Sequence, residues 1–208
     1  MDNCLENIFP TNKRHIKDVV LVHISSFPDF FLSELGSKFL FLFYSRIVEA
    51  SEGIAFVYLN DSGIPTGFVA GTSNPRGFYS RLLKRDWLAF ALAAIPTVLR
   101  KPAIIGRVAR AVFHPSDNPV GNDLAGLFSI GVLPEQQRTG VGKKLVQAFL
   151  KESKRRGCNR VFLTTDQDHN DAVNAFYVKH GFSVKRRFVT PEGRRMNEYW
   201  ITLPEHVL

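Results

Sequence analysis

The stretch Ile130–Leu145, IGVLPEQQRTGVGKKL, leads from an apolar strand, through a turn at Pro134, into the start of a helix. A helix N-terminus presents free N–H groups and a partial positive charge. Gly140 and Gly142 carry no side chains, so a ligand can approach that backbone closely. The pattern predicts a seat for a pyrophosphate. The alternative is a strand-to-helix turn whose glycines serve tight packing alone.

Spacing excludes two common phosphate-binding loops. A P-loop needs a glycine five residues before its Gly-Lys pair and a Ser or Thr after it, but these positions hold Gln137 and Lys144. A dinucleotide-binding loop needs a third glycine, where this chain has Leu145. The turn therefore matches neither of these nucleotide-binding motifs.

A second stretch, NDAVNAFYVKHGF, follows at Asn170–Phe182. In this order and spacing, the two stretches resemble the signatures of GNAT-type (Gcn5-related) N-acetyltransferases. The first signature matches at Gln137, Gly140 and Gly142. The second matches at Asn170, Ala172, Phe176, Tyr177, Gly181 and Phe182. The resemblance covers the chain except residues 75 to about 123, and it favours a ligand-binding turn over glycines for packing.

The resemblance implies an α+β fold, an α/β/α sandwich around a mixed sheet of about seven strands that splays between its fourth and fifth strands. One domain over residues 1–208 is expected, with a basic helical insertion at about 75–122 before the fourth strand. The hydrophobic periodicity agrees with this order. It predicts strands in 5–9, 54–72, 124–133, 158–166, 182–189 and 196–203, and helices in 13–27, 33–50 (with Ser33 as N-cap), 78–95, 97–113, 141–157 and 170–181.

The resemblance also implies acetyl-CoA as the cosubstrate. The pantetheine arm would add to the splayed strand through the backbone at Ile130, Gly131 and Val132, with the thioester carbonyl near the Val132 N–H. Such a donor stabilises a developing oxyanion. The pyrophosphate would contact Arg138, Thr139, Gly140, Val141, Gly142 and Lys143, and Gln137 would also bind the cofactor.

Two residues of the second signature take roles by resemblance. Tyr177 would act as the general acid that donates a proton to the departing CoA thiolate, and it would also contact the cofactor. Asn170 would contact the pantetheine region. The alternatives are a core tyrosine on the face formed by Val173, Phe176, Tyr177 and His180, and an N-cap for Asn170.

The general base is the weakest part of the predicted site. Many relatives carry a carboxylate eleven residues before the Gln of the turn, where this chain has Gly126. Asp166 and His169 are the candidates elsewhere, with satisfaction of loop polar groups as the alternative for each. An amine of pKa near 8, such as an amino sugar or an α-amine, needs less base than a lysine side chain of pKa about 10.4.

The formal net charge is +8, and most of the excess lies in one segment. Residues 75–113 hold eight Lys or Arg against one acid, Asp86. Three interpretations stay open: a structural cap, a lid whose cations meet a phosphorylated or nucleotide-linked acceptor, or a helix on an anionic membrane with Trp87, Phe90 and Leu92 inward. Nucleic acid is disfavoured because no recognised binding module is present.

The remaining features predict an intracellular, cytoplasmic protein. The longest apolar run, Trp87–Leu99, is too short to span a bilayer and contains Pro96, where we expect a break. Cys4 and Cys158 have no pairing framework around them and no metal-ligand spacing, so both are expected to be inert. No metal is expected, and the oligomeric state is not predicted.

The leading hypothesis is an acetyl-CoA-dependent N-acetyltransferase that joins an acetyl group to an amine-bearing small molecule by direct attack in a ternary complex. The alternatives are a protein or peptide N-acetyltransferase and a non-catalytic acyl-CoA-binding regulator. Aromatic residues in FPDFF (residues 27–31) and FLFLFY (residues 39–44) fit core packing or an acceptor pocket.

Overall fold

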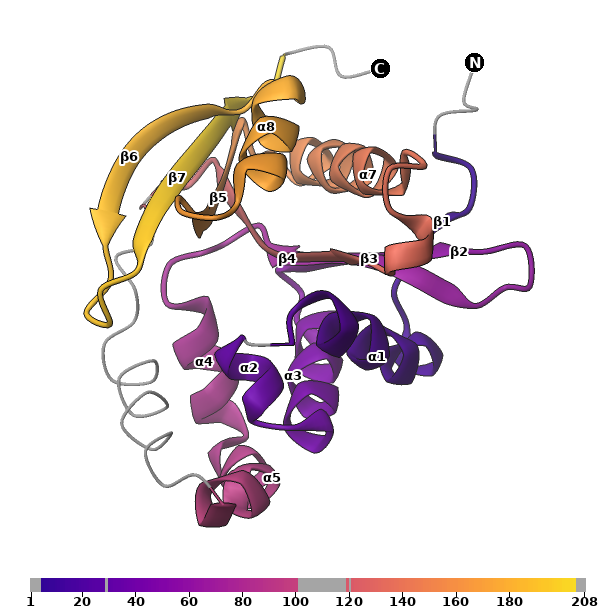
Figure 1. Cartoon of the computed structure of the whole chain (residues 1–208), viewed down its shortest axis with the longest axis vertical. Helices are drawn as coiled ribbons and strands as arrows, with labels where there is room; N and C mark the ends of the chain where they lie inside the picture. Colours follow the sequence, from indigo (N-terminus) through magenta and orange to yellow (C-terminus); the bar gives the residue numbers. More distant parts are fainter. Residues whose placement is uncertain (1–4, 29, 101–118, 120, 205–208) are drawn as a thin grey trace.

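A seven-stranded mixed sheet forms the centre of the computed structural model, which describes residues 5–28, 30–100, 119 and 121–204 (Figure 1). The strand order is β1-β2-β3-β4-β5-β7-β6. The strands are β1 Ile8–Pro10, β2 Gly53–Leu59, β3 Pro65–Thr72, β4 Leu124–Val132, β5 Arg160–Asp166, β6 Ser183–Val189 and β7 Arg195–Thr202. The predicted α+β class and strand number are confirmed.

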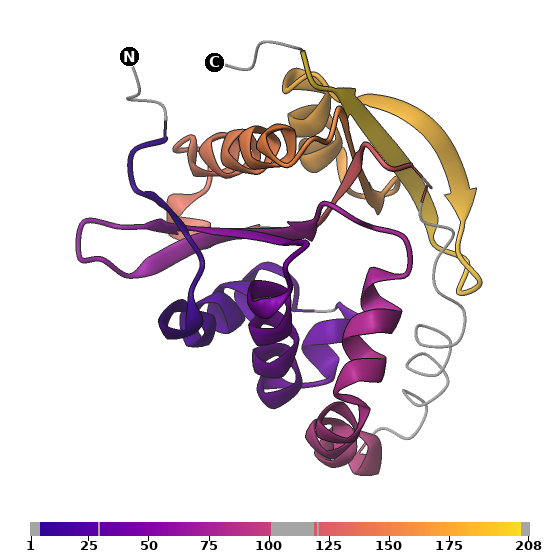
Figure 2. The same cartoon turned by 180° about the vertical axis from the view of Figure 1, so that it is seen from behind.

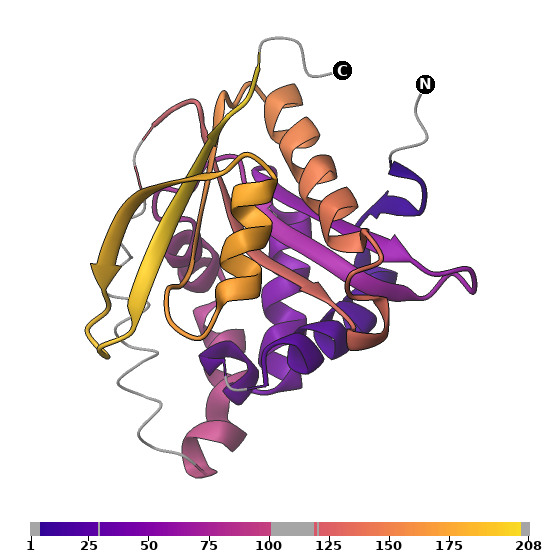
Figure 3. The ribbon, with the colours of Figure 1, turned by 45° about the horizontal axis from the view of Figure 1, so that its top comes forward.

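Helices cover both faces of the sheet, as the sandwich predicts (Figures 1 and 2). One face carries α1 (Ile16–Ser26), α2 (Phe31–Glu34), α3 (Ser37–Glu49), α4 (Phe78–Arg85) and α5 (Trp87–Arg100). The other carries α7 (Val141–Arg155) and α8 (Asp171–Lys179), which Figure 3 shows in front of the sheet. Each face has its own apolar core, one around Leu40, Tyr44 and Phe68 and one around Val69, Leu145 and Phe149.

The sheet opens between β4 and β5. These parallel strands pair over three positions, from Leu124↔Arg160 to Gly126↔Phe162, although both strands continue beyond. The splay predicted between the fourth and fifth strands is therefore confirmed. On its other edge β4 stays paired with β3 up to Val132.

A β-bulge lies in β4 where the splay begins. Gly71 pairs with Leu127 and the next residue back in β3, Ala70, pairs with Ser129, so Phe128 is the extra residue. Phe128 packs against the core beneath α3 and α4, and the Ser129 side chain hydrogen-bonds Tyr44 of α3. Both side chains therefore point to the same face, as a bulge allows.

The helix predicted over residues 33–50 is wrong at its start. Gly36 adopts φ +89°, a left-handed conformation that separates α2 from α3. Ser33 lies inside α2, where its hydroxyl donates to the Phe27 carbonyl at 2.6 Å, and it caps no helix.

The described part of the insertion is α4 and α5, and the predicted break at Pro96 is also wrong. The chain breaks at Asp86, and Pro96 lies within α5. Thr97, one residue later, donates from its hydroxyl to the Leu35 carbonyl at 3.2 Å and fixes the helix at that point.

Phe90, predicted on a membrane-facing side, packs in the core against Phe39 at 5.1 Å between ring centroids. Residues 101–118 and 120 of the insertion proposed for 75–122, with most of the helix predicted in 97–113, lie outside the described residues, as does Cys4.

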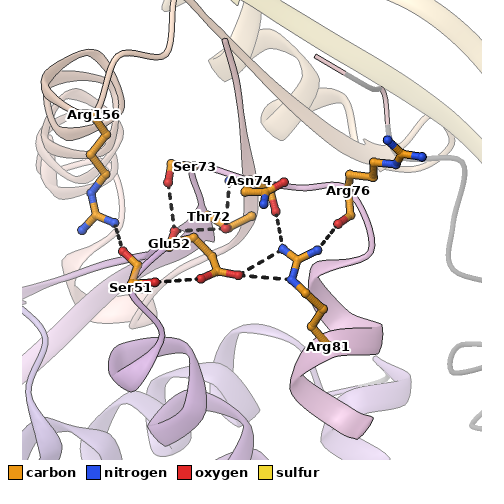
Figure 4. A network of polar contacts seen from close by, with 8 residues as sticks. All are labelled: Ser51, Glu52, Thr72, Ser73, Asn74, Arg76, Arg81 and Arg156. Atoms are coloured by element: carbon orange, nitrogen blue, oxygen red, sulfur yellow. Dashed lines mark hydrogen bonds and ion pairs between the residues drawn. The ribbon is translucent and has the colours of Figure 1, made fainter. Parts of the chain in front are cut away.

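A polar network joins the sheet, α4 and α7 at the end of β3 (Figure 4). Arg81 of α4 donates to the Glu52 carboxylate at 3.1 and 3.2 Å, to the Asn74 carbonyl at 3.0 Å and to the Arg76 carbonyl. Arg156, after α7, donates to the Ser51 carbonyl at 2.7 Å. In the part of the chain that the structure describes, no helix is long and apolar enough to cross a membrane.

Candidate functional site

The turn before α7 has the geometry of an anion seat. Gly140 occupies the N-cap of α7 at φ +92°, and no side chain caps the helix. A Cβ added to Gly140 would meet no atom within 4 Å, so the space before the helix is open. The first N–H groups of this 15-residue helix therefore face a space that a phosphate can enter.

Side chains within the turn fix its shape. The Gln137 amide donates to the Val132 carbonyl at 3.1 Å, which ties the turn to the end of β4. The Thr139 hydroxyl donates to the Gln136 carbonyl at 2.7 Å. Arg138 adopts φ +64°, a conformation that non-glycine residues rarely take. Gln137 is thus placed as a structural residue of the turn, while contact of the backbone from Gly140 to Lys143 with a pyrophosphate stays a prediction.

The free edge of β4 lies next to this turn. Beyond Gly126 the edge toward β5 has no paired strand among the described residues, and it includes Ile130, Gly131 and Val132. An extended pantetheine arm can pair with such an edge as a further strand would. At Gly131 a Cβ would lie 2.8 Å from the Phe68 ring and 2.9 Å from the Ser26 hydroxyl of α1. A glycine there lets α1 pack closely against the end of β4.

Tyr177 lies on the buried side of α8, with 4% of its surface exposed. Its ring packs against Phe182 and Tyr199 at 5.6 and 5.8 Å between centroids. Burial raises the pKa of the Tyr177 phenol above its usual value of 10.0, so the hydroxyl keeps its proton. Burial is the one cause of this shift, and no hydrogen bond contributes to it among the described residues. Tyr177 is therefore both a core residue and a protonated phenol.

Asn170 occupies the N-cap position of α8, as the alternative predicts, but its side chain makes no capping hydrogen bond. The Asn170 amide instead donates to the Thr165 hydroxyl at 2.8 Å and to the Asp166 carbonyl at 3.1 Å. These bonds hold the end of β5 against the start of α8, across the splay from β4.

The turn, the free edge and Tyr177 reproduce the arrangement that the two signatures imply, and the model of the acetyltransferase (GNAT) family matches residues 22–182. The chain belongs to the GNAT family. GNAT proteins use acetyl-CoA as the acetyl donor, and the open turn before α7 fits its pyrophosphate.

Solved structures with the same fold include both small-molecule and protein acetyltransferases of low identity. Aminoglycoside 6′-acetyltransferase type Ii has a TM-score of 0.63 at 13% identity, over 96% of this chain and 99% of that chain. Ard1 from Thermoplasma volcanium has 0.61 at 18% identity, over 95% and 97%. The ribosomal-protein-S18-alanine N-acetyltransferase from Escherichia coli has 0.57 at 15%, over 97% of each chain. A search of curated proteins gave no significant match.

In this GNAT protein, aromatic rings fill the space beside Gly126, the position where a carboxylate was expected by resemblance to many relatives. A Cβ at Gly126 would lie 2.8 Å from the Phe128 ring and 3.0 Å from the Phe162 ring. No acidic side chain fits there without displacement of these rings. The lack of a carboxylate is therefore part of the packing, and the bulge that turns Phe128 toward this face contributes to it.

Asp166 and His169, the candidate bases, lie at the end of β5 and in the loop after it. Both Asp166 oxygens accept hydrogen bonds from Arg194, at 3.0 and 2.7 Å. His169 is exposed and adopts φ +53°. Their surroundings favour loop and hairpin structure for Asp166, while a catalytic role for either residue stays a prediction.

The fold also brings two groups to the α1–α4 face of this GNAT protein that the sequence did not reveal. Glu198 of β7 is 3% exposed and accepts hydrogen bonds from the Trp200 indole at 2.8 Å and from Arg186 at 2.9 Å. Ring contacts place Trp200 beside Phe162 at 6.2 Å. The one signal in the sequence was an acid in the middle of a predicted strand, beside the apolar Tyr199, Trp200 and Ile201.

The second group is a chain of hydrogen bonds from α1 to the bulge. His23 Nδ1 and the Tyr44 hydroxyl lie 2.7 Å apart, and Tyr44 hydrogen-bonds the Ser129 side chain. His23 is fully buried and its pKa is lowered to about 4 by burial, so its imidazole is neutral. Ser129, which is half-buried, is the end of this chain nearest the free edge of β4.

No group of three or more His, Cys, Asp or Glu side chains in the described residues is placed to hold a metal ion. The Cys158 thiol is buried, and burial raises its pKa, which disfavours the reactive thiolate.

Proposed function

We propose that the protein is an acetyl-CoA-dependent N-acetyltransferase that acts on an amine of a small-molecule acceptor. The observation that carries the proposal is the free edge of β4, beside which lie the open N-terminus of α7 and the helix α8 that carries Tyr177 (Figure 3). Family membership supports acetyl transfer, and the acceptor class is the further step.

In the proposed reaction both substrates are bound together. The amine nitrogen attacks the thioester carbonyl, the new C–N bond forms as the C–S bond breaks, and the amine loses one proton to solvent. The backbone N–H at Val132 would stabilise the oxyanion. Tyr177 would give its proton to the CoA thiolate and regain one from solvent. The phenol is a weaker acid than a thiol, so partial transfer in the transition state is the role we assign to it.

The insertion supports a small acceptor. Its first helix, α4, lies directly against the bulge, with Tyr79 and Phe78 at 4.7 and 5.9 Å from Phe128 between ring centroids. A helix in this position narrows the approach to the splay from the α1–α4 face. The aminoglycoside and S18-alanine acetyltransferases share the fold, so the fold by itself does not choose between small molecules and proteins.

The blocked space beside Gly126 supports an acceptor that needs little help from a base. An amine of pKa near 8 is partly neutral at pH 7, whereas a lysine side chain is almost fully protonated. We therefore expect amino sugars or α-amines to be better acceptors than lysine side chains.

The test is CoA thiol release from acetyl-CoA with a panel of amino sugars, free amino acids, lysine derivatives and peptides. The proposal expects turnover on small amines of low pKa. Turnover confined to peptides would support a protein N-acetyltransferase. Tight acetyl-CoA binding with no turnover on any amine would support a non-catalytic regulator.

Tyr177→Phe should lower kcat by about 10²–10⁴-fold with little change in acetyl-CoA affinity, since the proposed role is confined to the transition state. Tyr199→Phe is the matched control, because this neighbouring buried phenol donates to Asn174 at 3.0 Å and has no proposed catalytic role. Equal kcat values for the two variants would remove Tyr177 from the mechanism.

A further inference from the structure

The outward face of α5 is apolar along its whole length. Leu88, Leu92, Ile95 and Leu99 are 56%, 58%, 46% and 80% exposed, and their spacing places them in one stripe. Trp87, at the start of the helix, is 64% exposed. Within α5, which the structure describes in full, Arg100 is the one exposed residue that is not apolar. We call Trp87 and these four residues the α5 face.

The opposite side of α5 packs against the core, and this packing keeps the α5 face toward solvent. Phe90 and Ala94 are buried, Phe90 packs against Phe39, and Thr97 is bonded to the Leu35 carbonyl. An ordinary surface helix places charged residues on its outer side. A contiguous exposed apolar face is typical of an interaction surface. Figures 1 and 2 show α5 at the end of the molecule farthest from α7, where a large planar partner can reach it.

Positive charges frame the α5 face at both ends. Lys84 and Arg85 precede the helix and are exposed, Arg100 ends it, and Lys101 follows in the sequence. Asp86, the acid between α4 and α5, is engaged by Arg46 at 2.8 Å. An apolar stripe between cations complements a surface with an apolar interior and anionic headgroups.

We propose that α5 docks the protein on an anionic lipid surface. The leucines and Ile95 enter the boundary between headgroups and acyl chains, Trp87 lies at headgroup level, and Lys84, Arg85 and Arg100 bind lipid phosphates. The α1–α4 face of the sheet, where the acceptor is expected, lies on the same side of the sheet as α5 (Figure 1).

The test is flotation of the full chain with vesicles of phosphatidylcholine, with and without phosphatidylglycerol. Binding is expected to phosphatidylglycerol vesicles, with weakening by salt and a blue shift of Trp87 emission that Trp87→Phe removes. Leu92→Gln combined with Leu99→Gln should reduce partitioning at least about tenfold. Lys84→Glu combined with Arg100→Glu should reduce it by about fivefold or more for each lost charge.

Leu21→Gln is the matched control, because Leu21 on α1 is 62% exposed but lies outside the α5 face. Loss of vesicle binding in the Leu92/Leu99 variant but not in this control supports the proposal. Equal binding to neutral and anionic vesicles, or no binding to either, would overturn it. A sedimenting dimer that dissociates in the Leu92/Leu99 variant, with no vesicle binding, would show that a second copy covers the face. Turnover on the amine panel is measured separately, so failure here is distinguishable from failure of the proposed reaction.

Discussion

His23 is a buried histidine whose apolar surroundings lower its pKa. It is enclosed by Phe27, Tyr44 and Phe68, and its Nε2 has no hydrogen-bond partner among the described residues. A neutral imidazole in apolar surroundings costs less than a cation, which explains the lowered pKa. The unpartnered Nε2 lowers the free energy of unfolding, and the hydrogen bond between Nδ1 and the Tyr44 hydroxyl partly offsets this loss.

His23 should make the protein less stable in mild acid. Between pH 6.5 and about 4 the unfolded chain binds a proton at His23 and the folded chain does not. The free energy of unfolding therefore falls as pH drops through this window, by about 2 kcal/mol at pH 5. Denaturant unfolding of wild type and His23→Gln at pH 7 and pH 5 measures the effect.

The glutamine variant should lose less stability than wild type between these two values. The comparison stops at pH 5 because the titration of Glu152 also affects stability at lower pH. The pKa of Glu152 is lowered to about 2, chiefly by its hydrogen bond from Arg155. Equal losses in the two proteins would show that His23 is not the group that titrates.

At the scale of elements, α7 has a left-handed glycine at each end. Gly140 is its N-cap at φ +92° and Gly157 follows its last turn at φ +84°. A Cβ at either position would meet nothing within 4 Å, so an alanine would be strained by its backbone conformation alone. The two glycines are equivalent in structure but lie at opposite ends of the helix.

Gly140→Ala and Gly157→Ala should each cost about 1–2 kcal/mol of stability. We expect Gly140→Ala to weaken acetyl-CoA binding about tenfold more than Gly157→Ala does. The new methyl group of Gly140→Ala would enter the proposed phosphate seat. Thermal unfolding and calorimetric titration with acetyl-CoA measure the two effects. Equal affinities in the two variants would argue against the turn as the pyrophosphate seat.

The sequence predicted the elements best where a motif and a periodic pattern coincide, as from β4 through α7 to α8. It failed at Gly36 and Pro96, where the periodic pattern does not fix the ends of the helices. Beside Pro96, Thr97 donates to the Leu35 carbonyl, a contact between distant residues that the sequence does not reveal. The bulge at Phe128 was not predictable either, since it depends on the register with β3. For the same reason Ser129 was missed, and Glu198 was missed because its face depends on the register of β7 with β5.

At the scale of the molecule, the network of Glu52 and Arg81 joins the insertion to the sheet at the end away from the turn before α7 (Figure 4). Arg81 bonds the Asn74 and Arg76 carbonyls, so it also shapes the connection from β3 to α4. Since α4 packs on Phe128, its position affects the approach to the splay.

Arg81→Met should loosen α4, while the amides of α7 stay protected against hydrogen exchange. Loss of these charge-assisted bonds should raise hydrogen exchange of the α4 amides about tenfold. Arg85→Met is the control, because Arg85 is largely exposed and lies 4.0 Å from Asp86. An equal rise in exchange across α4 and α7 would indicate global destabilisation and contradict a local role.

The rings beside Gly126 also bear on how this protein can evolve. A single nucleotide change converts a glycine codon to one for aspartate or glutamate, so an acid at this position is ordinarily one genetic step away. Here that step places a side chain against Phe128 and Phe162 and is penalised unless both rings change as well. Selection for acceptors that need a strong base would therefore have to act through several simultaneous substitutions, which makes the present chemistry of the site difficult to reverse.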